Sequence, residues 1–409
     1  MVHLGYQGAV NRNARISMEQ IKVLQITQSL GGGVQKYVIQ LCQNLNPNQF
    51  NVTGCCSMES NGDSGDGDTP FSEAFRIRGI PYLVVPMQRS ISLWNDFFSL
   101  LRIYKNIRQR GFDIVHAQSS KAGVLARIAA RIAGVPVVIY SPHAFSFDGP
   151  GRIVTKLPFI FFEKIASWFC DAIITDSFTE KALALKFKIA EEKKIVVVPP
   201  GINLQEYPEI SENERRAYRE KLGISNGHKV VAMIGRLAPQ KDPITFILSS
   251  QKLHKEYSKV TFLLIGDGPL KDKCLNLVRE VGLGEDVKML GWRRDYKMLL
   301  SISDVLVITS LWEGLPFILL EAMACSKPVV ATRTTGTLDV INNGENGFLV
   351  PPRSPAVLAH KIKLVLENPD VAERIGKSAR KTVEEKFGLG KMITSIEEVY
   401  LQLYQKKKR

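Results

Sequence analysis

The segment EGLPFILLEAMA, Glu313 to Ala324, carries two glutamates eight positions apart and follows the apolar run DVLVITS, Asp304 to Ser310. The apolar run is typical of a buried strand in a parallel sheet. The residues after Pro316 are rich in helix formers, and Pro316 suits the first helical position. This order predicts that Glu313 lies in a strand-to-helix turn and Glu321 roughly two turns into the helix. The free N–H groups and the positive dipole end of such a helix favour an anion.

Two interpretations of this glutamate pair are open from the segment alone. One carboxylate beside a bound phosphate and a second one in the helix would suit a nucleotide sugar, which has hydroxyl groups at both ends of a diphosphate. Alternatively, Glu313 caps an ordinary amphipathic helix and Glu321 lies on its solvated face, because a short motif is only a hypothesis until its context supports it.

The composition indicates a globular protein with more than one domain. The chain has 409 residues, of which 45% are hydrophobic and 23% charged, and this length exceeds the usual single core. Six scattered cysteines without a CxxC pair argue against a disulfide framework or zinc site and fit a cytoplasmic, reducing compartment. Residues 1–20 form a basic extension without the apolar core of a secretory signal, and no apolar stretch is long enough to predict a transmembrane helix.

The net charge of +14 predicts an anionic partner. Basic residues cluster at Arg102 to Arg110, at Lys186 to Lys194 and in the terminal KKKR. Such clusters attract nucleic acid, anionic membranes or anionic small molecules. The sequence has no zinc finger, aromatic-interleaved RNA-binding strand or helix-turn-helix, so nucleic acid is not expected as a partner. A membrane face that carries an anionic acceptor is favoured, with ordinary solvated helix faces as the alternative.

Strand-like and helix-like segments alternate along the chain in two series. The strand candidates of the first series are 21–27, 50–57, 82–85, 113–116, 137–140, 172–175 and 195–198, and those of the second are 229–235, 260–266, 287–290, 304–310, 328–332 and 347–350. This alternation predicts an α/β fold of two Rossmann-like domains with mostly parallel sheets that face each other across a cleft. We place the first domain at residues 21–202 and the second at 203–387, joined by a hinge at Pro199–Gly201.

Four strand-to-helix junctions of the second series carry unusual turns. GRLAPQKDP, Gly235 to Pro243, places Arg236 and Lys241 after a buried strand, where a guanidinium and an ammonium would hold a diphosphate and neutralise a phosphate leaving group. Solvated surface cations are the alternative. Gly266-Asp267-Gly268-Pro269 is a tight turn whose glycines permit close approach of a ligand. Gly291-Trp292-Arg293-Arg294 is the third junction, and the glutamate segment is the fourth.

Two features of the first series also predict ligand contacts. Gly31-Gly32-Gly33 lies between a strand and a helix, where backbone N–H groups can approach an anion or a sugar. The sequence lacks GxGxxG with an acidic residue after the second strand, which counts against NAD, and lacks a phosphate loop, which counts against an NTPase. His143, in SPHAFSF, follows a strand and is either a structural hydrogen-bonding group or a catalytic residue, whereas the structural role is favoured for His116.

Together these motifs resemble those of the GT-B fold retaining glycosyltransferases of family 4, the group 1 glycosyl transferases of bacterial polysaccharide and exopolysaccharide synthesis. The resemblance covers roughly residues 21–400. The segments that carry it are the glutamate pair, GRL with the following QK, GDGP, the glycine turn and HAF at His143. They are specific for the family and carry little information about the sugar.

The resemblance implies an enzyme that transfers a sugar from a nucleoside diphosphate donor, with UDP as the expected nucleotide and with retention of anomeric configuration. By this resemblance, Arg236 and Lys241 bind the diphosphate, Glu313 the hydroxyls of the transferred sugar, and Glu321 the ribose. Gly32, Gly33, Gly266, Gly314, Leu315 and Pro316 would lie against the donor, His143 near the sugar, and Trp292 and Arg293 beside the base. Because cations and a helix dipole hold the diphosphate in such enzymes, no metal and no other cofactor is implied.

Three positions depart from the family pattern. Ala144 stands where many members have glycine after the histidine, and Thr335 to Asp339 replaces the usual Gly-Gly-x-Pro-Glu segment. Gln118 stands where a second histidine is frequent, and the sequence assigns it no role.

The first domain is expected to bind the acceptor, a saccharide or a polyprenyl-diphosphate-linked saccharide at the inner face of the plasma membrane. Its apolar and basic segments at 91–98, 102–110 and 153–162 would supply a peripheral contact with anionic lipid. The resemblance also implies that the last helix, about 388–409, packs back on the first domain. A GT-B nucleotide-sugar epimerase, a phosphorylase and a non-catalytic sugar-nucleotide-binding protein are the alternative functions.

Overall fold

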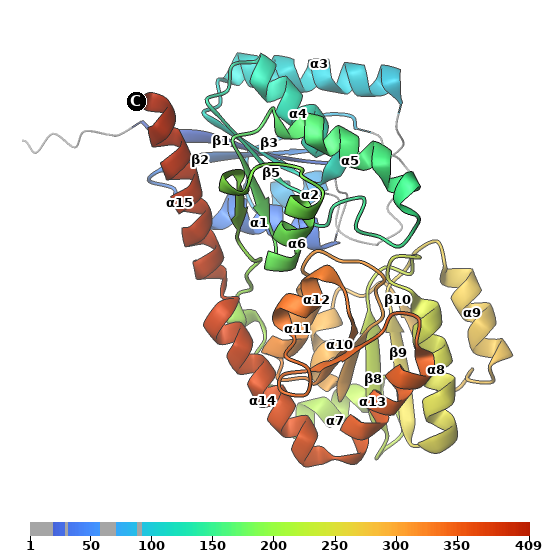
Figure 1. The fold of residues 1–409 in the computed structure, drawn as a ribbon. Helices are drawn as coiled ribbons and strands as arrows, with labels where there is room; N and C mark the ends of the chain where they lie inside the picture. Colours follow the sequence, from blue (N-terminus) through green and yellow to red (C-terminus); the bar gives the residue numbers. More distant parts are fainter. Residues whose placement is uncertain (1–18, 29–31, 58–70, 88–91) are drawn as a thin grey trace, which may run out of the picture.

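The computed structural model describes residues 19–28, 32–57, 71–87 and 92–409. The basic N-terminal extension lies outside the described residues except for Glu19 and Gln20, and so do Gly31 and Ile91. Figure 1 shows two α/β lobes, with the first half of the chain in the upper lobe and most of the second half in the lower one. Among the described residues no helix is long and apolar enough to cross a membrane.

The upper lobe contains a sheet of parallel strands in the order β3-β2-β1-β4-β5-β6-β7. Its strands are β1 (Ile21–Thr27), β2 (Phe50–Cys56), β3 (Tyr82–Val84), β4 (Ile114–Gln118), β5 (Val137–Ser141), β6 (Ala172–Thr175) and β7 (Ile195–Val197). Its helices are α1 (Gly32–Asn44), α2 (Phe71–Ile77), α3 (Leu93–Arg110), α4 (Ser120–Ile132), α5 (Ile153–Ser167) and α6 (Phe178–Lys186). The short 3-10 helices η1 (Glu192–Lys194) and η2 (Leu204–Glu206) flank the connection to the lower lobe.

The lower lobe contains a second parallel sheet in the order β10-β9-β8-β11-β12-β13. Its strands are β8 (Lys229–Ile234), β9 (Val260–Ile265), β10 (Val287–Gly291), β11 (Val305–Ile308), β12 (Val329–Thr332) and β13 (Phe348–Val350). Its helices are α7 (Glu212–Lys221), α8 (Pro243–Glu256), α9 (Lys271–Glu280), α10 (Tyr296–Ile302), α11 (Phe317–Ala324), α12 (Thr335–Val340), α13 (Pro355–Glu367) and α14 (Pro369–Lys386).

All strand candidates of both series form strands, with ends that differ by at most a few residues from the predicted ones. The α/β fold class with two parallel sheets is therefore confirmed. Parallel strands buried on both faces read as short apolar runs, which is why the sequence pattern located them. The order of strands reverses once in each sheet, between β1 and β4 and between β8 and β11. In open α/β sheets, ligands bind beyond the carboxyl ends of the strands at such a reversal.

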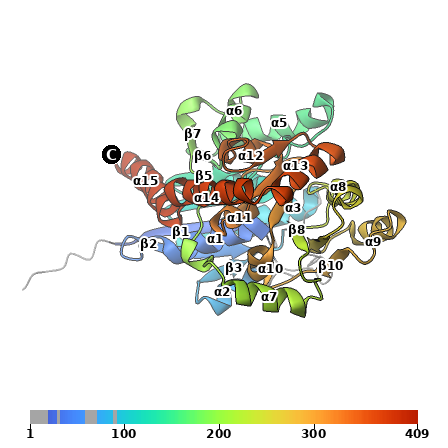
Figure 2. The ribbon, with the colours of Figure 1, turned by 90° about the horizontal axis from the view of Figure 1, so that it is seen from below.

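The last helix, α15 (Leu389–Lys408), leaves the lower lobe and packs on the upper one. It runs along one side of the upper lobe in Figure 1, and Figure 2 shows it continuing from α14. Its buried residues join a core cluster with β1, β4, β5 and α1. The chain crosses between the lobes a second time here, since Ile202 pairs with Gly388 in an isolated parallel bridge. The domain boundaries that we place after residues 202 and 387 remain predictions.

The carboxyl ends of the two sheets face each other and are joined by direct contacts. Thr335 Oγ1 of α12 donates to Asp148 Oδ2 in the loop after β5, at 2.6 Å. The N–H of Thr179 in α6 donates to Asp339 Oδ2 of α12, at 3.1 Å. The segment Thr335 to Asp339, which departs from the family pattern, therefore supplies contacts between the lobes.

Candidate active site

The glutamate segment forms the junction between β11 and α11 at the strand-order reversal of the lower sheet. Pro316 occupies the N-cap position with ψ of 123°, so α11 begins at Phe317 and not at Pro316 as predicted. Glu321 is consequently the fifth residue of the helix, which is fewer than the two turns that the sequence suggested. The extended ψ of Pro316 accounts for both differences, since a helical residue would need a negative ψ near −42°.

Glu313 is 8% exposed and forms an ion pair with Lys241. Its Oε1 atom also accepts a hydrogen bond of 2.8 Å from Ser310 Oγ. Lys241 belongs to the loop after β8, and this loop is held beside the glutamate turn by a 2.8 Å hydrogen bond from the N–H of Leu311 to the carbonyl of Gln240. The structure thus brings Lys241 and Glu313 together from the two strands that flank the order reversal, while Arg236 lies in the same loop as Lys241.

Glu321 is buried, with 3% of its surface exposed. Its Oε1 atom accepts hydrogen bonds from the hydroxyls of Tyr207, at 2.9 Å, and Tyr296, at 3.1 Å, and forms an ion pair with Lys36 of α1. Burial and the nearby carboxylate raise the pKa of both tyrosine hydroxyls well above the usual value. The alternative in which Glu313 caps the helix and Glu321 lies on a solvated face is therefore wrong, because both carboxylates are buried and paired.

The glycine turn of the upper lobe faces the start of α11. A methyl group at Gly33 would lie 3.1 Å from Cδ2 of Phe317, the first residue of that helix. Gly32 has φ of +71°, a conformation that favours glycine, and no atom of the described residues lies within 4 Å of where its Cβ would be. Gly33 therefore presents its backbone toward the N-terminal end of α11 from the opposite lobe.

His143 lies between two hydrogen-bonding partners at the carboxyl end of the upper sheet. Its Nδ1 atom is 3.0 Å from Asp176 Oδ2, and its Nε2 atom is 2.8 Å from Gln118 Oε1. His143 and Ala144 have φ of +52° and +87°, so the position where relatives often have glycine adopts a glycine-like backbone. Gln118, to which the sequence assigned no role, thus contacts the predicted site histidine.

The buried carboxyl group of Glu180 forms hydrogen bonds with the backbone of this loop and of Asp176. Glu180 is 1% exposed and accepts hydrogen bonds from the backbone N–H groups of Ala144, at 2.9 Å, and Asp176, at 2.8 Å. Burial, followed by the neighbouring Asp176 carboxylate, raises the pKa of Glu180. These hydrogen bonds offset part of the unfavourable backbone conformation and hold His143 and Asp176 in register.

The glycines of GDGP have a packing function that the sequence did not reveal. A methyl group at Gly266 would lie 2.0 Å from the carbonyl oxygen of Gly235, and one at Gly268 would lie 2.7 Å from the carbonyl oxygen of Leu237. We expected these glycines to admit a ligand, but the close neighbour is the backbone of the loop that carries Arg236. GDGP therefore fixes the position of that loop.

Trp292 and Arg293 follow β10, the edge strand, and are separated from β11 by β9 and β8. Arg293 forms a bidentate pair with Asp295, at 2.7 Å and 2.6 Å, and this pairing raises its pKa further. The guanidinium of Arg294 lies over the Trp292 ring, 5.7 Å from its centroid. Of the predicted site residues, these two are the farthest across the sheet from Glu313.

Gly314 is enclosed by backbone from both lobes. A methyl group at Gly314 would lie 3.0 Å from the nitrogen of Ala144, and one at Gly336 in α12 would lie 1.4 Å from the carbonyl oxygen of Gly314. The glutamate turn is therefore packed between α12 and the His143 loop. Leu315, the next residue of the turn, is 6% exposed.

Several residues of the site could not be identified from motifs. Asp176 follows β6, so the rule that ligand-binding groups follow strand ends would have found it. Lys36, Tyr207 and Tyr296 come together only around Glu321, and their sequence neighbourhoods carry no comparable signal. No group of three or more His, Cys, Asp or Glu side chains suited to a metal ion occurs in the part of the chain that the structure describes.

Comparisons with known proteins identify the family. Residues 31–206 match the model for "Glycosyltransferase Family 4", and residues 214–382 match that for "Glycosyl transferases group 1". An Escherichia coli UDP-Gal:alpha-D-GlcNAc-diphosphoundecaprenol alpha-1,3-galactosyltransferase is 30% identical over 390 residues, which cover 94% of this chain and 97% of that protein. The Staphylococcus aureus capsular polysaccharide biosynthesis glycosyltransferase CapM is 28% identical, over 78% of this chain and 84% of that protein.

A solved structure of Anabaena HepE in complex with UDP and glucose has the same fold. It superposes with a TM-score of 0.81 over 94% of this chain and all of that one, at 21% identity. The two-lobed GT-B architecture and the sequence matches define a nucleotide-sugar-dependent transferase of this fold class. This chain belongs to the family 4 glycosyltransferases and is a glycosyltransferase, which sets aside the epimerase, phosphorylase and non-catalytic alternatives.

The packing at Gly336 predicts a strong effect of a single methyl group. In Gly336→Ala the new Cβ meets the Gly314 backbone, which cannot turn aside as a side chain can, so we expect a loss of stability of about 1–3 kcal/mol. Displacement of the Gly314 turn should also lower kcat/KM for the donor by at least about tenfold. Gly284→Ala is the matched control, because nothing lies within 4 Å of its Cβ position. Equal denaturation midpoints and equal kinetics for the two variants would contradict the packing argument.

Proposed function

We propose that this chain transfers a sugar from a UDP-linked donor to a saccharide carried on a polyprenyl diphosphate, with retention of anomeric configuration, in bacterial polysaccharide synthesis. The E. coli relative is named for a UDP-galactose donor and a diphosphoundecaprenol-linked GlcNAc acceptor. UDP-galactose is accordingly the first donor to test. The single observation that carries the proposal is the Lys241–Glu313 pair at the strand-order reversal, beside the N-terminal end of α11.

The donor diphosphate would bind between these charged groups. In the structure Lys241 and Glu313 form an ion pair. A diphosphate at the start of α11 would take over the ammonium of Lys241, together with the guanidinium of Arg236 and the free N–H groups of the helix. Glu313 would then be released to bind hydroxyl groups of the transferred sugar. After this exchange Lys241 would pair with the diphosphate, and the Glu313 carboxylate would accept hydrogen bonds from the sugar hydroxyls.

The same groups would stabilise the transition state. Charge develops on the departing diphosphate as the glycosidic bond breaks, and cations already fixed in position give the largest electrostatic stabilisation. The proposed chemistry is a front-face substitution in which the acceptor hydroxyl gives its proton to the departing phosphate. The contacts that join the lobes at Thr335 and Thr179 would exclude water and so limit hydrolysis of the donor.

The remaining donor contacts are proposed from the family resemblance. Glu321 would bind the ribose through its second carboxylate oxygen, since Oε1 already accepts from Lys36 and two tyrosines. Gly32, Gly33 and the backbone of Gly314 to Pro316 would lie along the diphosphate and sugar, with His143 at the sugar. Trp292 and Arg293 would flank the base at the far side of the lower sheet. GDGP would contribute by holding the Arg236 loop.

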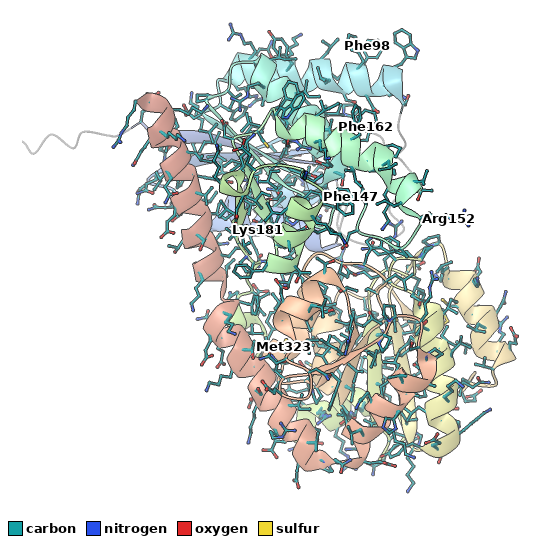
Figure 3. All side chains as sticks on the ribbon, viewed as in Figure 1. Phe98, Phe147, Arg152, Phe162, Lys181 and Met323 are labelled. Atoms are coloured by element: carbon teal, nitrogen blue, oxygen red, sulfur yellow. The ribbon has the colours of Figure 1, made fainter. Side chains whose placement is uncertain are left out.

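The acceptor is proposed to arrive from an anionic membrane surface that contacts α3 and α5. The large exposed apolar side chains of these helices include Trp94 (77%), Phe97 (52%), Phe98 (54%), Val154 (68%), Phe161 (59%) and Phe162 (59%). Figure 3 shows Phe98 and Phe162 projecting from the two helices on the upper lobe. The inner side of α5 is held by the buried pair of Arg127 and Glu163, so its outward apolar face is fixed in place.

Positive charge accompanies this apolar surface. Arg102, Lys105, Arg108 and Arg110 of α3 are exposed, and Arg152 precedes α5. Aromatic side chains that enter the interface and basic ones that pair with anionic headgroups are the two contributions that hold peripheral proteins on a bilayer. The proposed location is therefore the cytoplasmic face of the plasma membrane.

A transfer assay with UDP-sugars and a GlcNAc-diphosphate-lipid acceptor tests the proposed function. We expect product with at least one UDP-sugar, and we expect Arg236→Ala and Lys241→Ala each to lower kcat/KM by about tenfold or more, because each removes a charge-assisted contact with the diphosphate. Lys377→Ala is the control, since Lys377 pairs with Glu373 on the exposed face of α14 in the same lobe. Rates for Arg236→Ala and Lys241→Ala within about threefold of wild type would contradict the assignment.

The charge balance of the site also predicts that transfer does not depend on a divalent cation. Two cations and a helix N-terminus face the diphosphate in this proposal, so a metal is not needed to neutralise it. The rate in excess EDTA should stay within about twofold of the rate in magnesium. A rate that collapses in EDTA and returns on addition of a divalent metal would refute metal independence.

Membrane contact predicts vesicle binding that depends on both charge and aromatic side chains. The protein should float with vesicles that contain phosphatidylglycerol at low salt and not with phosphatidylcholine alone. Phe161→Ser/Phe162→Ser should weaken binding by about tenfold or more. Val357→Ser, on α13 of the other lobe, is an exposed apolar control. No flotation of the wild-type protein, or equal flotation of both variants, would remove the surface from the proposal.

A further inference from the structure

One face of the upper sheet changes from apolar to polar along its strands. Because side chains two apart share a face, Val23 is followed by Gln25, Ile114 by His116 and Gln118, and Ile139 by Ser141. The apolar members belong to the core beneath α1 and α15. The polar members, Gln25, His116, Gln118 and Ser141, are all 0% exposed. Buried polar groups are costly without partners, so their hydrogen bonds define what this region does.

The hydroxyl group of Tyr400, on α15, lies over this polar region. Gln25 Nε2 donates to Tyr400 Oη at 2.7 Å, and His116 Nδ1 is 2.7 Å from the same oxygen. Since the amide supplies a hydrogen to the oxygen, the single hydrogen of the phenol is directed to His116 Nδ1. Burial, and then the neighbouring His143, lowers the pKa of His116 to about 3, which favours the neutral ring. Its Nε2–H donates to Ser141 Oγ, at 2.8 Å.

The orientation of the Gln25 amide determines the orientation of a second amide, that of Gln118. With its NH2 group on Tyr400, Gln25 presents Oε1 to Gln118, whose Nε2 donates to it at 2.9 Å. Gln118 in turn presents Oε1 to His143 Nε2, at 2.8 Å. Each amide donates through its nitrogen and accepts through its oxygen. The orientation of Gln25 at Tyr400 therefore determines the orientation of Gln118, and Gln118 presents its oxygen to His143 Nε2.

The other side of His143 is also occupied. Its Nδ1 atom faces Asp176 Oδ2. The backbone N–H of Asp176 donates a hydrogen bond to Glu180 Oε2. The edge of the Tyr37 ring lies against the imidazole, with centroids 4.6 Å apart. Among the described residues, the charged and titratable groups near His143 are Asp176, Tyr37, His116 and, beneath the loop, Glu180. Gly314 of the other lobe packs against this loop, since a methyl group at Gly314 would lie 3.2 Å from Asp176 Oδ2.

We infer that Tyr400 of the C-terminal helix, acting through Gln25 and Gln118, is a positioning residue for His143 that keeps a hydrogen on its Nε2 atom. The Nε2–H of His143 is then directed to Gln118 Oε1, while Nδ1 lies beside the Asp176 carboxylate. The inference rests on the proposed function, because it concerns a histidine that we place at the transferred sugar. By this inference, α15 orients a residue of the site in addition to packing on the upper sheet.

The protonation of the ring can be read directly by nitrogen-15 NMR of histidine-labelled protein, with His143→Gln to assign the signals. In the wild-type protein we expect Nε2 of His143 to carry a hydrogen. Tyr400→Phe keeps the ring that packs in the core but removes the oxygen that orients Gln25. The amides can then turn over, and the Nε2 signal should move toward that of an unprotonated nitrogen.

Tyr404→Phe is the matched control on the same helix. Its hydroxyl donates to Asp113 Oδ1, at 3.2 Å, outside the chain that leads to His143. We expect Tyr404→Phe to leave the His143 signals and kcat unchanged. Tyr400→Phe should lower kcat about tenfold with a donor KM within about twofold, which corresponds to about 1.4 kcal/mol. Gln25→Met, which removes both ends of the same amide, should reproduce the NMR change if Tyr400→Phe does not fold.

The outcomes separate this inference from the proposed function. An unprotonated Nε2 in the wild-type protein, or signals that are the same in Tyr400→Phe and Tyr404→Phe, would overturn the inference even if transfer is observed. The expected NMR change in a protein that transfers no UDP-sugar would support the inference and contradict the proposed function. If the NMR signal changes but kcat does not, Tyr400 does orient His143. The inference that this orientation contributes to turnover would then be overturned.

Discussion

The site depends on the close packing of the Gly314 turn between two backbone segments. The His143 loop of the upper lobe lies on one side, and α12 lies on the other, so close that Gly336 has no room for a methyl group. Interiors at this density transmit displacement, because a shifted backbone has no void to move into. Glu313, the start of α11 and the contact between the lobes are therefore fixed together, and none of them can change position alone.

The charged and polar groups around this turn lie in pairs. Lys241 pairs with Glu313, Lys36 with Glu321, and Asp176 lies beside His143. Uncompensated buried charge is strongly unfavourable, so by the proposed function the donor diphosphate would exchange partners with these groups. Such exchange is the physical reason that we propose for discrimination in favour of a diphosphate. The pair between Lys36 and Glu321 also joins α1 of one lobe to α11 of the other, which couples the site to the arrangement of the lobes.

The periodic features of the chain were predictable from the sequence. Apolar runs such as Ile21 to Thr27 coincide with strands because both faces of a parallel sheet are buried. The helix at Phe317 to Ala324 was also located, although its N-cap was misplaced by one residue. The motifs at the strand ends predicted that Lys241 and Glu313 belong to one donor-binding site. The glycines of GDGP also approach the backbone of the Arg236 loop closely, a contact that no sequence pattern indicates, and their contact with a ligand stays a prediction.

The sequence by itself determined the two α/β series, the turns at the strand ends and membership of a glycosyltransferase family, because these depend on local periodicity and short-range spacing. Only the tertiary structure decided the partners of those residues. Tyr400 reaches Gln25, and Lys36 reaches Glu321, across separations of 375 and 285 positions. No local pattern encodes such contacts, since they arise when α15 folds back on the first sheet and the two lobes meet. The contacts that define the environment of the glutamate pair therefore come from residues that lie far from it in the chain.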